Sequence, residues 1–503
     1  MHKMILKIIP ILIVLVLICG CISGGGGDTT TPAPTTAPTT AAPTTTAALT
    51  TAAPTTTVAP TLPPTTEPPK PSEMDDAWTM IYKDEYGTNY SPDSLPQTPE
   101  VLWYRDGVFL GPSVIEYGHV YVPVQKLDDV QGDRLVCLDL EDGSTVWESA
   151  LQYNRNMDCT DLVYYRSPAI SEEKIVFLSC GNSCILQCFD AFDGTKAWEK
   201  TVDTNYRIYL SPTIADGKVY VMYTNSICYG DFINEYNDFA DLNNGRIACY
   251  DLETGNMLWE ERMNLAFYGN PIIYDDKVYF GAVDGATAIG YLVCLDAEDG
   301  ELLWTNELLS ADRALYNLDE PVWRIAYGHD NIYVTLFDYD IDWAFFGYSS
   351  IACYDPDNGD RKWEFMTDTG FFFGDHLSIS EDYVYFGVRW NTIDEPSGIR
   401  IYKLDPSNGN ILWSSYLPDF MDFMVMGGDT LYVGFRYGAY NADVNKWEYD
   451  NNFYGISGNS GVQNWFYTES PDYSSMVIYG GIYPSVASGY YVASVGFRLY
   501  CFT

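Results

Sequence analysis

Basic residues and histidine are scarce in this sequence. Lys and Arg number 27 against 69 Asp and Glu, the formal net charge is −42, and only 4 His are present. Nucleic-acid phosphates and anionic lipid headgroups would be repelled by such a charge. We therefore exclude nucleic-acid binding and a basic membrane-binding patch. The acidic excess is interpreted as a solvated surface, with cation binding or attraction of a basic partner as the alternative.

Several enzyme signatures are also missing. The chain contains no Gly-x-Ser-x-Gly, no His pair at metal-binding spacing, no adjacent Cys-Cys and no Cys-x-x-Cys-His. These patterns carry nucleophilic hydrolysis, zinc binding and haem attachment. His119 and His329 each follow a Gly in a short turn, and His376 begins an expected strand, so a structural role is assigned to all three. The sequence predicts no catalytic residue.

Long apolar runs are missing everywhere except at the N-terminus. The run Ile8–Ile18 is short for a transmembrane helix, and two lysines precede it. It ends in Ile18-Cys19-Gly20-Cys21, which resembles the lipobox of lipoproteins. Residues 1–21 are therefore predicted to be a lipoprotein signal peptide, with Cys21 as the lipid-bearing residue on the outer side of the cell membrane. An uncleaved anchor that happens to end in Cys is the alternative.

Residues 22–75 are rich in Thr, Pro and Ala. Such a segment has too little apolar surface to offset the entropy lost on ordering. We expect a disordered stalk whose reach is on the order of 100 Å where it is polyproline-like. Thr beside Pro suggests O-glycosylation, and a plain flexible linker is the alternative.

Residues 76–503 carry an internal repeat of eleven residues. Each copy has Asp at its third position, Gly at its seventh and Trp at its eleventh. The ungapped copies are 137–147, 188–198, 249–259, 294–304, 353–363 and 403–413. The pattern predicts a hairpin, because the Asp carboxylate can accept turn N–H groups and Gly supplies a positive φ. A degenerate seventh copy is assigned to the segment that runs through Tyr440 and Asn441 to Trp447.

Another pair of short strands precedes each copy, so four strands recur about every fifty residues. The C-terminal Leu499-Tyr-Cys501-Phe-Thr matches the start of a copy, and Val101-Leu-Trp103 matches the end of one. Together they would complete a single sheet and leave no free edge. The sequence therefore predicts an all-β fold, an eight-bladed β-propeller of four-stranded antiparallel blades, closed by N- and C-terminal strands that share one blade.

The eleven-residue unit resembles the tryptophan-docking motif of PQQ-like repeat proteins, with Cys where Ala is usual. The lead-in Trp78 to Ser91 is also similar to that family, and the resemblance covers nearly all of 76–503. It implies that one Trp per blade packs between adjacent blades and holds the ring together. These residues are Trp103, Trp147, Trp198, Trp259, Trp304, Trp363, Trp413 and Trp447.

Of the twelve Cys, six share one repeat position and are interpreted as small buried apolar residues: Cys137, Cys188, Cys249, Cys294, Cys353 and Cys501. Cys159, Cys180, Cys184 and Cys228 are expected on one face of the ring, where two disulfides are predicted. Three pairings stay open. A four-Cys metal site is the alternative, although Cys180 and Cys184 lack the usual two-residue spacing.

Two further features suggest binding. Asp338, Asp340 and Asp342 alternate in an expected loop of the fifth blade, where they could hold Ca²⁺ or form a solvated acidic loop. Long aromatic and acidic loops are expected on the face opposite the short turns, and suit carbohydrate or protein contacts. They are 148–166, 223–245, 305–320, 335–349, 390–398 and 449–475. Arg166, Arg207 and Arg324 precede inner strands, where they could meet an anionic ligand or local carboxylates.

These features favour a non-enzymatic, monomeric surface lipoprotein that binds an unidentified protein or carbohydrate through its long-loop face. The chain resembles the outer-membrane assembly-factor lipoproteins in its anchor and blades, but its long stalk departs from them and suits an archaeal or S-layered surface. No cofactor is predicted. The alternative is a PQQ-dependent dehydrogenase with its site in the central channel, and PQQ and Ca²⁺ stay open as ligands.

Overall fold

The computed structural model describes residues 74–93, 100–109, 111–125, 133–152, 167–180, 184–202, 210–223, 244–284, 289–308, 322–340, 346–367, 376–390, 398–417, 421–441, 446–469, 484–495 and 498–503. All of them belong to one compact unit, Pro68–Thr503. The signal peptide and stalk predicted over 1–21 and 22–75, with Cys21, lie outside the described residues, apart from 74 and 75. Within the ranges above, no helix is long and apolar enough to cross a bilayer.

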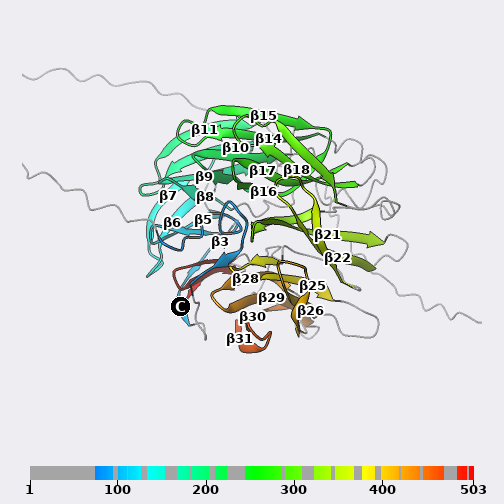
Figure 1. The fold of residues 1–503 in the computed structure, drawn as a ribbon. Helices are drawn as coiled ribbons and strands as arrows, with labels where there is room; N and C mark the ends of the chain where they lie inside the picture. Colours follow the sequence, from blue (N-terminus) through cyan, green and yellow to red (C-terminus); the bar gives the residue numbers. More distant parts are fainter. Residues whose placement is uncertain are drawn as a thin grey trace, which may run out of the picture. The chain divides into compact units, whose positions relative to one another are not determined.

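The described chain forms eight four-stranded antiparallel sheets, which we number as blades in chain order (Figure 1). Blade 1 has β4 (Val114–Glu116), β5 (His119–Gln125), β6 (Arg134–Asp139) and β7 (Thr145–Ala150), with β3 (Val108–Phe109) beside β5; blade 2 has β8 (Ala169–Ser171), β9 (Lys174–Cys180), β10 (Cys184–Asp190) and β11 (Lys196–Val202); blade 3 has β12 (Thr213–Ala215), β13 (Lys218–Tyr223), β14 (Gly245–Asp251) and β15 (Met257–Met263); blade 4 has β16 (Ala266–Tyr274), β17 (Lys277–Asp284), β18 (Ile289–Asp296) and β19 (Leu302–Glu307).

Blade 5 has β20 (Val322–Gly328), β21 (Asn331–Asp340), β22 (Phe346–Tyr354) and β23 (Arg361–Met366); blade 6 has β24 (Leu377–Ile379), β25 (Val384–Trp390), β26 (Gly398–Leu404) and β27 (Ile411–Leu417); blade 7 has β28 (Met421–Gly427), β29 (Thr430–Asn441), β30 (Lys446–Ser457) and β31 (Gln463–Glu469), with β1 (Tyr90–Ser91) parallel to β28; blade 8 has β32 (Pro484–Ala487), β33 (Tyr490–Val495), β34 (Arg498–Phe502) and β2 (Val101–Asp106). The predicted eight-bladed propeller is confirmed.

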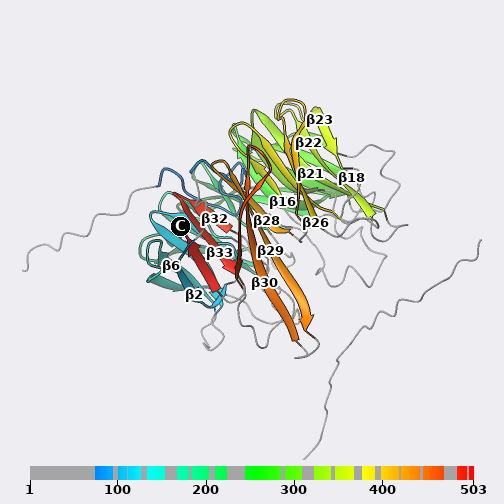
Figure 2. The same ribbon diagram turned by 90° about the horizontal axis from the view of Figure 1, so that it is seen from below.

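Blade 8 is the shared blade, as predicted. Its outermost strand β2 comes from the N-terminal side and pairs with the C-terminal β34, so that Trp103 stands opposite Cys501. Glu100 and Thr503 exchange two main-chain hydrogen bonds of 3.1 Å. The Arg498 guanidinium adds an ion pair to Asp106 at 2.7 Å. Figure 2 shows the C-terminus beside β2, where the ring closes.

The repeat turns form for the reason that their sequence indicates. In the first turn, Asp139 Oδ1 accepts hydrogen bonds from the N–H groups of Glu141 and Asp142, at 2.8 and 3.2 Å. Gly143 has φ +69°, in the left-handed region that favours glycine. The carboxylate thereby satisfies amides that the hairpin leaves unpaired, and the glycine reverses the chain. All of these turns, and the turns between the first two strands of each blade, lie on one face, which we call the turn face.

The repeated tryptophans join neighbouring blades. In seven seams the indole ring lies against the seventh-position glycine of the next blade, so closely that a Cβ built there would lie 2.5–2.7 Å from a side-chain atom. The same indole donates a hydrogen bond to the fourth-position carbonyl of that turn in most seams, for example from Trp147 to Ala191 at 2.9 Å. The glycines are Gly143, Gly194, Gly255, Gly300, Gly359, Gly409 and Gly461. The turn glycine therefore serves the seam as well as the hairpin.

The prediction that Trp447 is the docking tryptophan of blade 7 is wrong. Trp447 lies on β30 opposite Tyr440, near the far end of a long hairpin. The ungapped repeat copy runs instead from Gly455 to Trp465, with Ser457 at the third position and Gly461 at the seventh. Gly455 replaces the usual Cys and Ser457 the usual Asp, so the copy lost two of the four residues that mark the others.

Burial explains the repeated cysteines. All six are fully buried and free, as expected for small apolar core residues. Burial raises the pKa of Cys188 and of Cys249 to about 12, so neither thiol is ionised at neutral pH. Each of Cys137, Cys249 and Cys294 stands opposite a tyrosine on one neighbouring strand and a tryptophan on the other. The position is therefore part of the packing at the seams.

Candidate functional site: the hub and the two faces

Residues 74–91 form a segment at the inner ends of the blades, which we call the hub. Its buried residues include Trp78, which is fully enclosed, and Met80, Asn89 and Ser91. No strand pattern predicts the hub, because only β1 and single bridges in it have strand geometry. Its role is carried by main-chain contacts, which the sequence does not reveal.

The hub contacts the blades in their order around the ring. Its main chain bonds to the inner strands of blades 1, 2, 4, 5, 6 and 7. The pairs are Trp78 with Ile115, Thr79 with Ile170, Glu85 with Ile273, Tyr86 with Tyr327, Thr88 with Ile379 and Asn89 with Met426, at 2.8–3.2 Å. In blade 3 the Ile214 N–H donates to Met80 Sδ at 3.4 Å, and in blade 8 the Ser488 N–H donates to Asp76 Oδ2 at 3.4 Å. The contacted residues stand near the turn-face ends of their strands, so the hub occupies that end of the channel.

Arg324 is the buried cation of this region. It is 1 % exposed, and its guanidinium donates to the carbonyl oxygens of Gly87 at 2.8 Å and Leu377 at 2.5 Å. The guanidinium carbon also lies 4.0 Å from the centre of the Tyr82 ring. The sequence predicts an anionic ligand or a carboxylate as its partner, and in the structure its guanidinium holds main-chain carbonyls of the hub and of blade 6. Arg166 and Arg207 lie outside the described residues.

Polar residues occupy one equivalent position in blades 2 to 6, three residues before the inner-strand residue that contacts the hub. They are Ser167, Ser211, Asn270, Arg324 and His376, and all are buried. Their bonds link neighbouring blades, since the Ser211 hydroxyl accepts from the Ser167 N–H at 2.9 Å and the Asn270 amide donates to the Ser211 carbonyl at 2.7 Å. Hydrogen bonds therefore join blade 2 to blade 3 and blade 3 to blade 4 in this layer, and the Arg324 guanidinium joins blade 5 to blade 6, while the Ser167 hydroxyl has no hydrogen-bond partner among the described residues.

The hub is closed on itself by a carboxylate. Asp76 is 4 % exposed and pairs with Lys83 and with the Ser91 hydroxyl, so residues from both ends of the hub meet there. Asp84 makes a second turn, in which its carboxylate accepts from the Thr88 hydroxyl at 2.7 Å and the Thr88 N–H at 3.1 Å. Burial raises the pKa of Asp84, and the two bonds from Thr88 oppose that rise. The segment is therefore an ordered loop with its own polar core.

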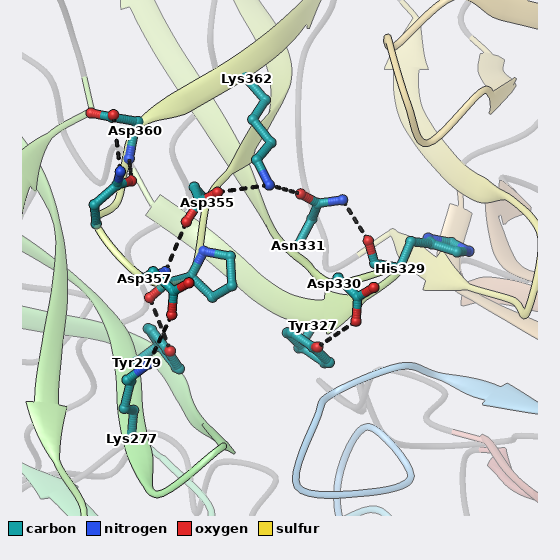
Figure 3. A network of polar contacts seen from close by, with 12 residues as sticks. Lys277, Tyr279, Tyr327, His329, Asp330, Asn331, Asp355, Asp357, Asp360 and Lys362 are labelled. Carbon is teal, nitrogen blue, oxygen red and sulfur yellow. Dashed lines mark hydrogen bonds and ion pairs between the residues drawn. The ribbon is translucent and has the colours of Figure 1, made fainter.

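The turn face carries polar links across the seams. Figure 3 shows the seam between blades 4 and 5, where Lys277 pairs with Asp357 at 3.1 Å and the Tyr279 hydroxyl donates to the Pro356 carbonyl at 3.1 Å. Lys362 bonds Asp355 at 2.9 Å, and this bond lowers the pKa of the Asp355 carboxyl. In this seam the Trp304 indole N–H has no partner among the described residues, and the fourth-position carbonyl, that of Pro356, accepts the Tyr279 hydroxyl.

The four remaining cysteines are only partly visible. Cys184 begins β10 and is disulfide-bonded. Cys180 ends β9 directly opposite it, with a side chain outside the described set. Cys159 and Cys228 lie outside the described residues. The pairing stays a prediction.

The acidic triplet of blade 5 is not in a loop. Asp338 and Asp340 belong to β21 and pair with Tyr348 and Phe346 of β22, while Asp342 lies outside the described residues. The predicted loop 335–349 is therefore mostly hairpin, and so is much of 449–475, which contains the ends of β30 and β31. The error arose because aromatic and acidic residues alternate there without the hydrophobic pattern of a core strand. Among the described residues no cluster of potential metal ligands is found.

Most of the other long loops predicted for the opposite face lie outside the described residues. Two hairpins define that face. β21–β22 and β29–β30 are longer than their counterparts, and in Figure 2 β29 and β30 run past the rest of their blade. β28 pairs with β29 only as far as Phe435, and β31 with β30 only as far as Asn451, so the outer part of the hairpin is a two-stranded arm.

Comparison with known proteins agrees with this architecture. The family model described as "Outer membrane protein assembly factor BamB" matches residues 96–233 and 239–363, which is more than half of the chain. The chain belongs to this family. Its matched region runs from the segment that contains β2 to the end of the repeat copy of blade 5 at residue 363. Among curated proteins no match is found.

Solved structures share the fold. A quinohemoprotein alcohol dehydrogenase from Pseudomonas putida is 13% identical, covers 86% of this chain and 80% of its own, with a TM-score of 0.56. A europium-containing methanol dehydrogenase is 14% identical, covers 85% and 98%, with a TM-score of 0.57. BamB from Moraxella catarrhalis is 12% identical, covers 81% and 100%, with a TM-score of 0.47. At these identities the likeness shows the propeller fold alone, and an activity must be argued from the site.

The described part of the channel does not fit PQQ, the cofactor that such a fold suggests. PQQ bears carboxylates, which need cations or free N–H donors. The cation described in the channel wall, Arg324, donates to main-chain carbonyls, and Lys83 of the hub pairs with Asp76. A carboxylate-bearing ligand would have to displace bonds that hold the hub to the ring.

Proposed function

We propose that this protein is a non-enzymatic, lipid-anchored surface protein, which binds a protein or carbohydrate partner through the face opposite the turn face. The observation that carries this proposal is the hub. Its main-chain bonds, and those of Arg324, use polar groups at one end of the channel to join the blades. The binding surface then falls to the opposite face, where the β29–β30 arm stands beyond its blade.

Membership of the BamB family supports a scaffold role by analogy, because the family description is that of an assembly factor. The lipid anchor at Cys21 and the stalk over 22–75 would hold the propeller away from the membrane. The formal net charge of −42 would oppose close approach to an anionic bilayer. A tethered domain with a free outer face is suited to collecting partners at the cell surface.

The test uses the full chain in native membranes. Chemical crosslinking and pull-down are compared between the wild type, a variant in which residues 436–450 are replaced by a two-residue turn, and a control with Glu298→Ala on the turn face. We expect one set of partners to be lost from the shortened arm and kept by the control. Partners that are the same in all three samples would contradict the assignment of the binding face.

The enzyme alternative has its own readout. PQQ and Ca²⁺ are added to the purified protein, and the quinone absorbance and dye reduction are followed. We expect no spectral shift and no dye reduction. A shifted absorbance with turnover would contradict the proposal and assign the chain to the dehydrogenases.

A further inference from the structure

The path of the N-terminal chain determines which contacts a pull on the stalk would reach first. The strand that closes the ring, β2, is also the first long strand after the stalk. It lies at the edge of blade 8 and pairs only with β34. If the tether led directly into β2, a pull on the anchor would act first on this edge strand, on its pairing with β34 and on the Trp103 contact with blade 1.

The chain instead passes through the hub before it reaches β2. From Met74 to Ser91 it bonds to blades 1 to 7 in order and meets blade 8 through Asp76. The strain of a pull would therefore meet Met74, whose N–H donates to Glu116 at 2.8 Å, and then the Asp76 contacts with Lys83 and Ser91. β2 lies behind all of these bonds.

We infer that the hub bears a pulling force that arrives through the stalk and distributes it over the blades. The pairing of β2 with β34, which closes the ring, is thereby protected from that force. The inference rests on the proposed function in one respect, that the stalk is a tether under load. Its physical content is separate, because it concerns only the order in which two sets of described bonds break.

Two further contacts support this role. Asn89 is 7 % exposed and its amide donates to the Met424 carbonyl at 2.5 Å and the Leu377 carbonyl at 3.3 Å, so a single side chain joins the hub to blades 6 and 7. Arg324 of blade 5 holds the Gly87 carbonyl in addition to the Leu377 carbonyl of blade 6. Side chains thus reinforce the main-chain bonds at the C-terminal half of the hub.

The experiment is single-molecule pulling of the full chain. One handle is a biotin-acceptor tag inserted in the stalk, and the other is attached through Asp299→Cys, an exposed turn position of blade 4. We expect two steps. The first releases the hub, about 20 residues or roughly 70 Å of contour at ~3.6 Å per residue, and the second, which follows only after the first, releases β2.

The variants separate the two joints. Asp76→Asn should lower the force of the first step and leave the force of the second step unchanged. If Asp76→Asn folds poorly, Asn89→Ala is used in its place, with the same expected result. Arg498→Gln, which removes the ion pair at the closure, should lower only the second step. A single step that releases the hub and β2 together, or Arg498→Gln lowering the first step, would overturn the inference. The measurement involves neither the lipid nor a partner, so its failure would leave the proposed function standing.

Discussion

Two seams of the ring differ in what their tryptophan meets. Between blades 3 and 4, Trp259 is 9 % exposed, lies against Gly300 and donates to the Ala297 carbonyl at 3.2 Å. Between blades 7 and 8 the next turn is split between Thr503 and Glu100, and the described residues there include no fourth- or seventh-position partner for the tryptophan.

Trp465 packs within its own blade rather than against the turn of the next blade. Its ring lies over Gly455 of its own blade, 5.3 Å from the Tyr432 ring, and its indole N–H is buried without a partner among the described residues. An aromatic pocket lined by Tyr432, Val433, Phe453, Trp465, Tyr467, Tyr491 and Phe502 remains there. The comparison shows that the repeat residues depend on the turn of the next blade. Where no such turn receives the tryptophan, the first position is a glycine, Gly455, and the Trp465 ring packs over it within its own blade.

The largest expected effect separates the two tryptophans. Trp259→Ala removes a buried ring and its hydrogen bond, and should lower the free energy of unfolding by ~3–5 kcal/mol. Trp465→Ala removes a partly exposed ring with no hydrogen bond, and should cost about 1–2 kcal/mol. Urea unfolding followed by circular dichroism measures both. Equal costs would show that the split turn makes no difference to docking.

The next prediction separates the cost of crowding the Trp259 ring from the cost of a positive φ at the turn glycine. Gly300→Ala places a Cβ 2.6 Å from the Trp259 ring at φ +78°, whereas Gly118→Ala has φ +71° and nothing within 4 Å. Both substitutions carry the left-handed penalty of ~1–2 kcal/mol, and only Gly300→Ala adds overpacking of ~1–3 kcal/mol. Thermal unfolding of the pair gives the difference. A cost at Gly300 no larger than at Gly118 would contradict the close docking.

A restored repeat residue should destabilise the closing seam. Gly455→Cys recreates the residue found at this position in most blades, but its side chain would overlap the Trp465 ring. We expect a loss of ~1–3 kcal/mol, whereas Cys294→Ala in a regular seam should cost about 1 kcal/mol. Denaturant midpoints measure both. Stabilisation by Gly455→Cys would show that Trp465 can dock outward.

The smallest effect is a pH dependence on the turn face. His329 contacts the Tyr333 hydroxyl of its own blade at 3.1 Å and the Glu381 carbonyl of blade 6 at 3.0 Å, with Asp330 and Asp382 nearby. Burial lowers the pKa of His329 below 6.5. The unfolded chain therefore binds more protons between that pKa and 6.5, and stability should fall as the pH drops through this interval.

His329→Gln should flatten this part of the melting-temperature profile between pH 7.5 and 5. His119, whose pKa burial also lowers, provides the matched control, because His119→Gln should flatten only its own contribution. An unchanged profile in His329→Gln would contradict a neutral His329 in the folded protein.

The repeats made most of the fold predictable, because Asp, Gly and Trp at fixed spacing each have a role in the turn or at the seam. Trp465 was missed because Gly455 and Ser457 replace the two residues that identify a copy; the spacing from Gly461 to Trp465 was the remaining signal. The hub could not be predicted, since its contacts are main-chain bonds between residues far apart in sequence. Only the lead-in similarity over Trp78 to Ser91 marked the segment.

The most direct test of the central claim is hydrogen exchange resolved to single amides in the full chain. The N–H groups of Ile170, Ile273, Tyr327, Ile379 and Met426 donate to hub carbonyls. We predict that they exchange as slowly as the ladder amides of the same blades. Exchange at the rate of exposed turns would contradict a hub that fills the channel and joins the blades.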